Sequence, residues 1–106
     1  MRRLDLTEIA RADLKSIRRY SQRTWGPDRT VRYMAELRDI MKGLAAGAVV
    51  SRNREDLRPG LQMATSGRHC VFFEVDESRI LVIRVLHDRM DYQQHLEAET
   101  GQDGDR

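Results

Sequence analysis

Hydrophobic residues in the first half of the chain recur at the spacing of α-helices. The first set follows Thr7, a residue type that caps helix N-termini, and stops at the turn formed by Trp25-Gly26-Pro27. Its members are Ala10, Leu14, Ile17 and Ser21. The second set lies between Pro27 and Gly47, and its members are Val31, Met34, Leu37, Met41 and Leu44. Because few residues separate the two predicted helices, we expect an antiparallel hairpin, with Trp25 anchoring the core at its turn.

The second half of the chain has the period of β-strands. Turn signals at 66–67 and 76–78 separate three predicted strands, at residues 61–65, 68–75 and 79–87. The short links favour an antiparallel meander, and residues 3–6 could add a short strand. Polar residues 51–56 are interpreted as a solvated loop. The pattern predicts an α+β fold, with an N-terminal antiparallel helix hairpin packed on a small, mainly antiparallel sheet.

The predicted strand 79–87 is apolar on both faces. Strict alternation places Ile80, Val82 and Leu86 on one face, and Leu81, Ile83 and Val85 on the other. The helix hairpin covers only one face, so either residues 91–96 or another chain must cover the second. We favour another chain, because residues 91–96 offer little apolar surface beyond Tyr92 and Leu96.

Length and composition bound the kind of protein. The 106 residues predict a single domain at 1–96, followed by a polar, disordered tail at 97–106. Charged residues make up 34% of the chain and hydrophobic residues 40%, which is typical of a soluble globular protein. Apolar runs such as 80–83 are too short to cross a membrane, and the N-terminus lacks the apolar stretch of a signal peptide. With Cys70 as the single cysteine, we expect a cytoplasmic protein without an internal disulfide.

Arginine carries nearly all of the positive charge. Of the 19 basic residues only Lys15 and Lys42 are lysines, and the formal net charge is +2. Arginine binds carboxylates and phosphates in a bidentate way, so the excess indicates an anionic partner, unless codon usage alone explains it. The three histidines and the one cysteine are dispersed without metal-ligand spacing, so we predict no metal and no cofactor.

Several segments, in chain order, resemble motifs of the ParE branch of the RelE/ParE toxin superfamily. They are Ala12-Asp13-Leu14 with Ile17 and Tyr20, followed by Trp25-Gly26, Tyr33 with Leu37, Leu57-Arg58-Pro59-Gly60-Leu61, Gly67-Arg68-His69 with Phe72-Phe73, and Arg84-Val85-Leu86-His87-Asp88-Arg89-Met90-Asp91. The resemblance spans about residues 4–96 and implies a RelE/ParE-like fold. Phe73 and Glu74 depart from the family pattern, which commonly has Tyr and a basic residue there.

The resemblance implies the toxin of a type II toxin–antitoxin system. Such a toxin inhibits DNA gyrase by binding and catalyses no reaction itself. A ParD-like ribbon-helix-helix antitoxin would neutralise it by covering the apolar sheet face and the groove beside the hairpin. DNA would be contacted only indirectly, through gyrase or the antitoxin. The residues expected to contact the target are Arg58, Arg68, Arg84, His87 and Arg89. Those expected to contact the antitoxin are Leu14, Arg18, Tyr33, Leu37, Phe72, Glu74 and Val82.

Two alternatives stay open, a RelE-like endoribonuclease that cleaves mRNA and a non-toxic relic that only binds its antitoxin. A nuclease needs a general base, a general acid and arginines converging on one face. Its candidates here are Arg58, Arg68, His69, Arg84, His87, Arg89 and Tyr92. Arg84 and His87 are three positions apart along a strand and should point to opposite faces, so we predict no catalytic residues.

Overall fold

The computed structural model describes residues 2–96 and contains two helices and one mixed sheet. In chain order the elements are β1 (Arg3–Leu6), α1 (Glu8–Trp25), α2 (Pro27–Ala45), β2 (Arg52–Asn53), β3 (Gln62–Ser66), β4 (His69–Val75) and β5 (Arg79–His87). The strands lie in the order β1-β5-β4-β3-β2; β1 is parallel to β5 and the other pairs are antiparallel. The predicted α+β fold is confirmed. Residues 97–106, predicted as a disordered tail, lie outside the described residues.

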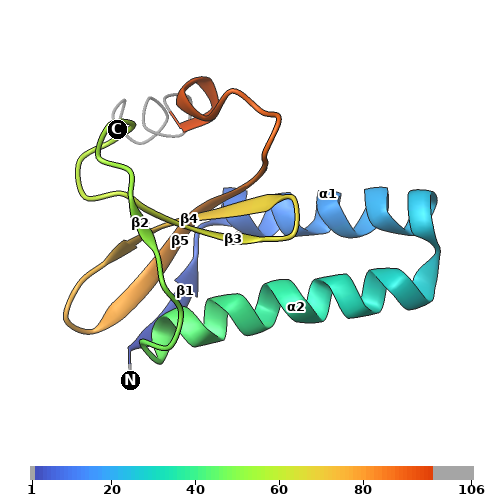
Figure 1. Ribbon diagram of the computed structural model, residues 1–106, viewed down its shortest axis with the longest axis horizontal. Helices are drawn as coiled ribbons and strands as arrows, with labels where there is room; N and C mark the ends of the chain where they lie inside the picture. Colours follow the sequence, from blue (N-terminus) through green and yellow to red (C-terminus); the bar gives the residue numbers. More distant parts are fainter. Residues whose placement is uncertain (1, 97–106) are drawn as a thin grey trace.

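The helix hairpin forms where the sequence signals place it (Figure 1). Thr7 caps α1, because its Oγ1 accepts a hydrogen bond from the Ala10 N–H at 3.0 Å. The same hydroxyl donates to the Ile83 carbonyl at 2.8 Å, which ties the start of α1 to β5. Gly26 joins the helices at φ 85°, in the left-handed region that favours glycine, and Pro27 opens α2. Neither described helix is long and apolar enough to span a membrane.

The strands agree with the prediction, with two corrections. The bounds of β1 and β5 are as predicted, β3 is shifted by one residue, and β4 begins one residue later than predicted and ends where predicted. The first correction concerns the segment 51–56, which is not wholly a loop, because Arg52 and Asn53 pair with Met63 and Gln62 as β2. A strand of two residues shows no period, so its pairing partner defines it rather than its own sequence.

The second correction concerns the faces of β5. A β-bulge shifts the register there: Phe72 pairs with Arg84 and Phe73 with Val82, so Ile83 is an extra residue. Val85 therefore joins Ile80 and Val82 on the helix side. Leu86 joins Leu81 and Ile83 on the far side, so the predicted strict alternation is wrong beyond the bulge.

The far side of the sheet is covered by the chain itself. Leu96, the last described residue of a helical segment that begins at residue 92, is 1% exposed and packs with Phe72 and Leu86. The ring of Tyr92 lies 5.0 Å from that of Phe72, centroid to centroid. Leu61, in the segment between β2 and β3, fills the rest of this second core. The expectation that another chain covers this face is wrong, because a few large side chains of the C-terminal segment are sufficient.

Candidate functional site

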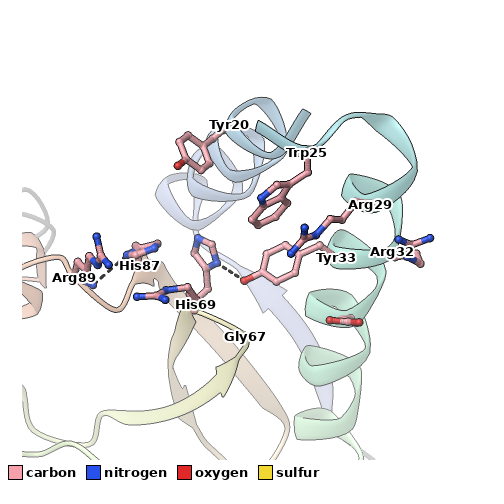
Figure 2. Close-up of a pocket in the computed structure, with 11 residues that line it drawn as sticks. Tyr20, Trp25, Arg29, Arg32, Tyr33, Gly67, His69, His87 and Arg89 are labelled. Atoms are coloured by element: carbon pink, nitrogen blue, oxygen red, sulfur yellow. Dashed lines mark hydrogen bonds between the residues drawn. The ribbon is translucent and has the colours of Figure 1, made fainter. Parts of the chain in front are cut away.

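A pocket of about 500 Å³ opens on the helix side of the sheet, where the hairpin turn faces the ends of β4 and β5 (Figure 2). We call it the ring pocket, because aromatic and imidazole rings line much of it. Its lining residues are Tyr20, Trp25, Arg29, Arg32, Tyr33, Glu36, Gly67, Arg68, His69, His87 and Arg89. Four arginines and a single glutamate make this lining strongly basic.

The rings contact one another in a continuous row. The Arg29 guanidinium carbon lies 4.4 Å from the centroid of the Trp25 ring, in cation–π geometry. The Trp25 and Tyr33 rings meet edge to face, with centroids 5.7 Å apart. Tyr33 is followed by His69 at 5.5 Å and His69 by His87 at 5.3 Å. The row connects the turn between the helices with the ends of two strands and holds each ring in a fixed orientation.

Hydrogen bonds fix the middle of the row. The Tyr33 hydroxyl donates to the Ser66 carbonyl at 3.1 Å and is hydrogen-bonded to Nδ1 of His69. A carbonyl only accepts, so we assign the phenol proton to Ser66 and the Nδ1 proton to His69, which then donates to the phenol oxygen. Burial raises the pKa of the Tyr33 phenol, so the ring stays protonated. In the neutral imidazole, Nε2 of His69 is therefore left as an acceptor.

The two histidines carry the electrostatics of the inner wall. Burial lowers the pKa of the His69 imidazole, and the neighbouring His87 lowers it further, while Asp88 acts in the opposite direction. His87 Nδ1 accepts a hydrogen bond from the Arg89 N–H at 3.1 Å and lies 3.0 Å from Asp88 Oδ1. At neutral pH His69 is therefore neutral and adds no charge to the four arginines of the lining.

Gly67 lets Tyr33 approach the turn between β3 and β4. Its φ is +57°, where side chains other than glycine are strained. A Cβ at this position would lie 2.8 Å from Cε1 of Tyr33 and 3.1 Å from its hydroxyl oxygen. The glycine therefore serves the turn and the ring row together.

Three of the residues predicted to contact the target line the ring pocket: Arg68, His87 and Arg89. Arg68 Nε lies 3.6 Å from Asp88 Oδ2, in an exposed ion pair. Arg58 and Arg84 lie elsewhere. Arg58 faces Glu74, with Nε and Oε2 3.4 Å apart, and its Nη1 is buried without a hydrogen-bond partner within residues 2–96.

Arg84 is used inside the fold. Its Nε and Nη2 donate to the two carboxylate oxygens of Asp13 at 2.8 and 3.0 Å, and both side chains are nearly buried. Its Nη1 donates to the His95 carbonyl at 3.3 Å. Arg84 pairs with Phe72 on the far side of the sheet, whereas His87 lies on the helix side. The two residues thus point to opposite faces, as their spacing predicts.

The residues predicted to contact the antitoxin are scattered. Leu37, Phe72 and Val82 are fully buried in the core and offer no surface, which corrects the expectation for these three. Tyr33 belongs to the ring pocket, Glu74 pairs with Arg58, and Leu14 packs partly buried against the helix-side core. Arg18 is the exposed member of the set.

Arg18 lies at a second hollow, a groove of about 280 Å³ between α1 and α2. The other residues of the groove are Gln22, Thr30, Val31, Met34, Ala35 and Arg38. Val31 is 68% exposed, which is unusual for a β-branched hydrophobic residue. The groove therefore combines an apolar floor with an arginine from each helix.

Sequence reasoning missed most of the helix side of the ring pocket. Arg29, Arg32 and Glu36 were not predicted, Tyr20 was named only as part of a family motif, and Trp25 is 36% exposed rather than a core anchor. One signal was present, since Arg29 and Tyr33 are four residues apart within α2 and so share one helical face. Trp25 is the last residue of α1, and it contacts both of them across the turn at Gly26. What the sequence does not contain is the position of that face opposite His69 and His87.

The ring pocket also collects segments that carry the family resemblance. Trp25, Tyr33, the Gly67-Arg68-His69 turn, His87 and Arg89 come from four of the quoted motifs and meet here. Asp13 and Arg84, from the first and last motifs, form the buried ion pair. Residues of these motifs therefore form one buried ion pair and line one open pocket.

Comparison with known proteins identifies the family. A family model described as the ParE toxin of the type II toxin–antitoxin system parDE matches residues 4–92. Toxin ParE1 of Caulobacter vibrioides is 36% identical over 91 residues, which cover 86% of this chain and 94% of that toxin. Toxin ParE of Escherichia coli is 39% identical over 92 residues, which cover 86% and 89%.

A solved structure has the same fold. It is described as a chromosomal ParDE TA system from P. aeruginosa, and it superposes with a TM-score of 0.71 over 82% of this chain and 96% of the other, at 24% identity. Family model, relatives and fold agree along nearly all of the described chain. This chain belongs to the ParE toxin family of type II toxin–antitoxin systems.

Proposed function

We propose that this toxin inhibits DNA gyrase by binding, without catalysing a reaction, and that the ring pocket lies on the surface that meets the gyrase–DNA complex. The observation that carries this assignment is the meeting of several family motifs at one basic pocket. Arg68 and Arg89 would face phosphate or carboxylate groups of the target there. The proposal places the protein in the cytoplasm, where gyrase acts.

The antitoxin surface is the groove between α1 and α2. The far side of the sheet is already covered by residues 92–96, whereas Val31 and Met34 line an open groove. An amphipathic helix of a ParD-like antitoxin would place apolar residues on this floor, with acidic residues opposite Arg18 and Arg38. The matching solved structure is a ParDE system, which supports an antitoxin partner.

The target assignment is tested by a supercoiling assay with purified gyrase, run beside a translation assay in which transcripts are mapped. We expect loss of supercoiling with intact transcripts. Arg89→Gln should weaken the inhibition about tenfold, the size of one lost charge-assisted hydrogen bond. Arg52→Gln, at the exposed two-residue β2, should leave inhibition unchanged. Normal supercoiling at a toxin concentration that stops growth would contradict the proposal.

A second candidate function is endoribonuclease activity, and one observation favours it. The His69 and His87 rings lie 5.3 Å apart, centroid to centroid, beside Arg68 and Arg89. Two imidazoles and a cation are the groups that cleave RNA through its 2′-hydroxyl. Cleaved transcripts with normal supercoiling would support this function instead. Expression without an antitoxin and without a growth defect would identify a relic that only binds its antitoxin.

A further inference from the structure

Two aromatic rings of the ring pocket are partly open to solvent. Tyr20 is 57% exposed and Trp25 36%, and both line the pocket. The only tryptophan of the chain and two of its three tyrosines line this pocket. Exposed aromatic faces gain free energy by stacking on another flat ring system. The helix side of the pocket is therefore suited to a planar, aromatic ligand.

The arginines on both sides of the pocket make it suited to an anion. Arg29, Arg32 and Arg89 form no ion pair with a carboxylate within residues 2–96, and Arg68 has only the exposed Asp88. Glu36 is the one acidic residue of the lining. Arginines whose charge is not matched inside the fold bind phosphate through two parallel N–H donors. Arg89 lies just beyond the end of β5, across the pocket from the hairpin turn (Figure 2). Arg68 lines the pocket from the turn between β3 and β4.

Size and rigidity narrow the ligand further. A volume of about 500 Å³ is in the range of pockets that enclose small molecules, and it exceeds what a lone phosphate fills. Trp25 is held on one side by Arg29 and at its edge by Tyr33, so a ligand need not order it. The carboxylates of an acidic peptide would pair with the arginines but would not stack on the rings. A neutral aromatic molecule would stack on the rings but would leave the arginines without a counter-charge.

We propose that the ring pocket binds a nucleoside 5′-phosphate unit, with the base stacked on Tyr20 and Trp25 and the phosphate held by Arg68 and Arg89. The unit is either a free nucleotide or one residue of single-stranded DNA. The inference deepens the function proposed above and rests on it for its biological setting. It also differs from the expectation that DNA is contacted only indirectly. Its test requires no gyrase, so the two proposals fail separately.

Trp25 supplies the measurement, because it is the only tryptophan of the chain and stands in the pocket. The full chain is titrated with deoxyadenosine 5′-monophosphate, with deoxyadenosine, with inorganic phosphate and with a short single-stranded oligodeoxynucleotide. Indole fluorescence is followed, and calorimetry confirms each affinity. We expect saturable quenching by the nucleotide, at least about tenfold tighter than binding of either half alone, because stacking and charge-assisted hydrogen bonds act together.

Three variants locate the site. Tyr20→Ala removes an exposed ring and should weaken nucleotide binding about tenfold, the size of one stacking contact. Arg89→Gln should weaken it by a similar factor and reduce its dependence on salt. Arg52→Gln, outside the pocket, should bind like the unchanged chain. Circular dichroism of all three checks that each variant is folded.

Each outcome has one meaning. Tighter binding of the oligodeoxynucleotide identifies a DNA strand as the source of the unit, and equal affinity identifies a free nucleotide. Inorganic phosphate binding as tightly as the nucleotide, or no saturable response to any nucleotide, would overturn the inference. Inhibition of supercoiling without nucleotide binding would overturn only this inference. Nucleotide binding with normal supercoiling would contradict only the proposed target.

Discussion

Arg84 and Arg89 are five residues apart in the sequence and belong to one motif, but their surroundings differ. Arg84 lies within β5, and Arg89 lies two residues beyond its end. Arg84 is joined to Asp13 by two hydrogen bonds, and the two side chains are 13% and 14% exposed. Arg89 is exposed and lines the ring pocket. The first arginine is part of the internal packing, whereas the second is open to a partner. Residue type and motif membership therefore do not distinguish a structural arginine from one that binds a target.

The difference arises from the edge of β5. β1 pairs with β5 only as far as Val82, and the strand continues beyond it without that neighbour. There α1 supplies Asp13, whose Oδ2 accepts from the Val85 N–H at 2.9 Å and from Arg84. A carboxylate thus satisfies a strand N–H that would otherwise be unpaired. Arg89 lies beyond the end of β5, where no such edge has to be closed.

The largest expected effect is on the buried ion pair. Asp13→Asn should lower the free energy of unfolding by about 3 kcal/mol, because it leaves the Arg84 charge nearly buried without its counter-charge. Arg89→Gln should change it by less than about 0.5 kcal/mol, since the side chain is exposed. Urea denaturation of both variants measures the contrast. Equal losses of stability would show that the Arg84 ion pair contributes no more to the fold than the exposed Arg89 does.

Leu96→Ala tests whether the C-terminal segment next to this ion pair covers the far side of the sheet. Arg84 holds the His95 carbonyl, and the next residue fills the second core. Removing this buried side chain should cost about 2 kcal/mol of stability, the usual loss for a leucine in a core. Gln94→Ala, at an exposed position of the same segment, is the control in the same denaturation experiment. A loss as small as that of the control would show that residues 92–96 do not cover the sheet.

Gly67→Ala acts on the ring pocket without removing a charge. The new methyl group meets Tyr33 and the backbone is strained at φ +57°, so we expect a loss of about 2 kcal/mol. Gly47→Ala is the matched control, because its φ is +75° but a Cβ there meets nothing within 4 Å. The difference between the two variants isolates the contact with Tyr33. Equal destabilisation by both would show that the contact contributes nothing.

The sequence predicts the elements of this fold better than it predicts the pocket. Thr7 and Pro27 are local signals, and the helices they bound are where they place them. The bulge at Ile83 cannot be recognised from the sequence, because β5 is apolar on both of its faces. The predicted assignment of Val85 and Leu86 to the two faces of the sheet was therefore reversed. A pocket is harder still, because its walls come from segments far apart in the chain. The spacing of Arg29 and Tyr33 indicates a shared face of α2, but it does not show which residues lie opposite that face.

The smallest effect is a dependence of stability on pH that belongs to the ring pocket. Burial, and then the nearby His87, lower the pKa of His69 in the folded chain, whereas its ordinary value is 6.5. Below that value the unfolded chain takes up the proton first. The contribution of the neutral imidazole is therefore complete above pH 6.5 and is lost as the pH falls through the folded pKa. Urea denaturation at a series of pH values should show a shallower fall in stability for His69→Gln than for the unchanged chain.

His95→Gln is the control for that series, since it removes a histidine outside the ring pocket and leaves the Arg84 contact to the His95 main-chain carbonyl possible. It measures how far the loss of a histidine outside the pocket changes the slope by itself, and His69→Gln should flatten the slope more. Equal slopes for His69→Gln and the unchanged chain would mean that His69 is not held neutral by its surroundings. In that case the inner wall of the pocket would carry positive charge as the pH approaches 6.5, and anion binding would not depend on the arginines alone.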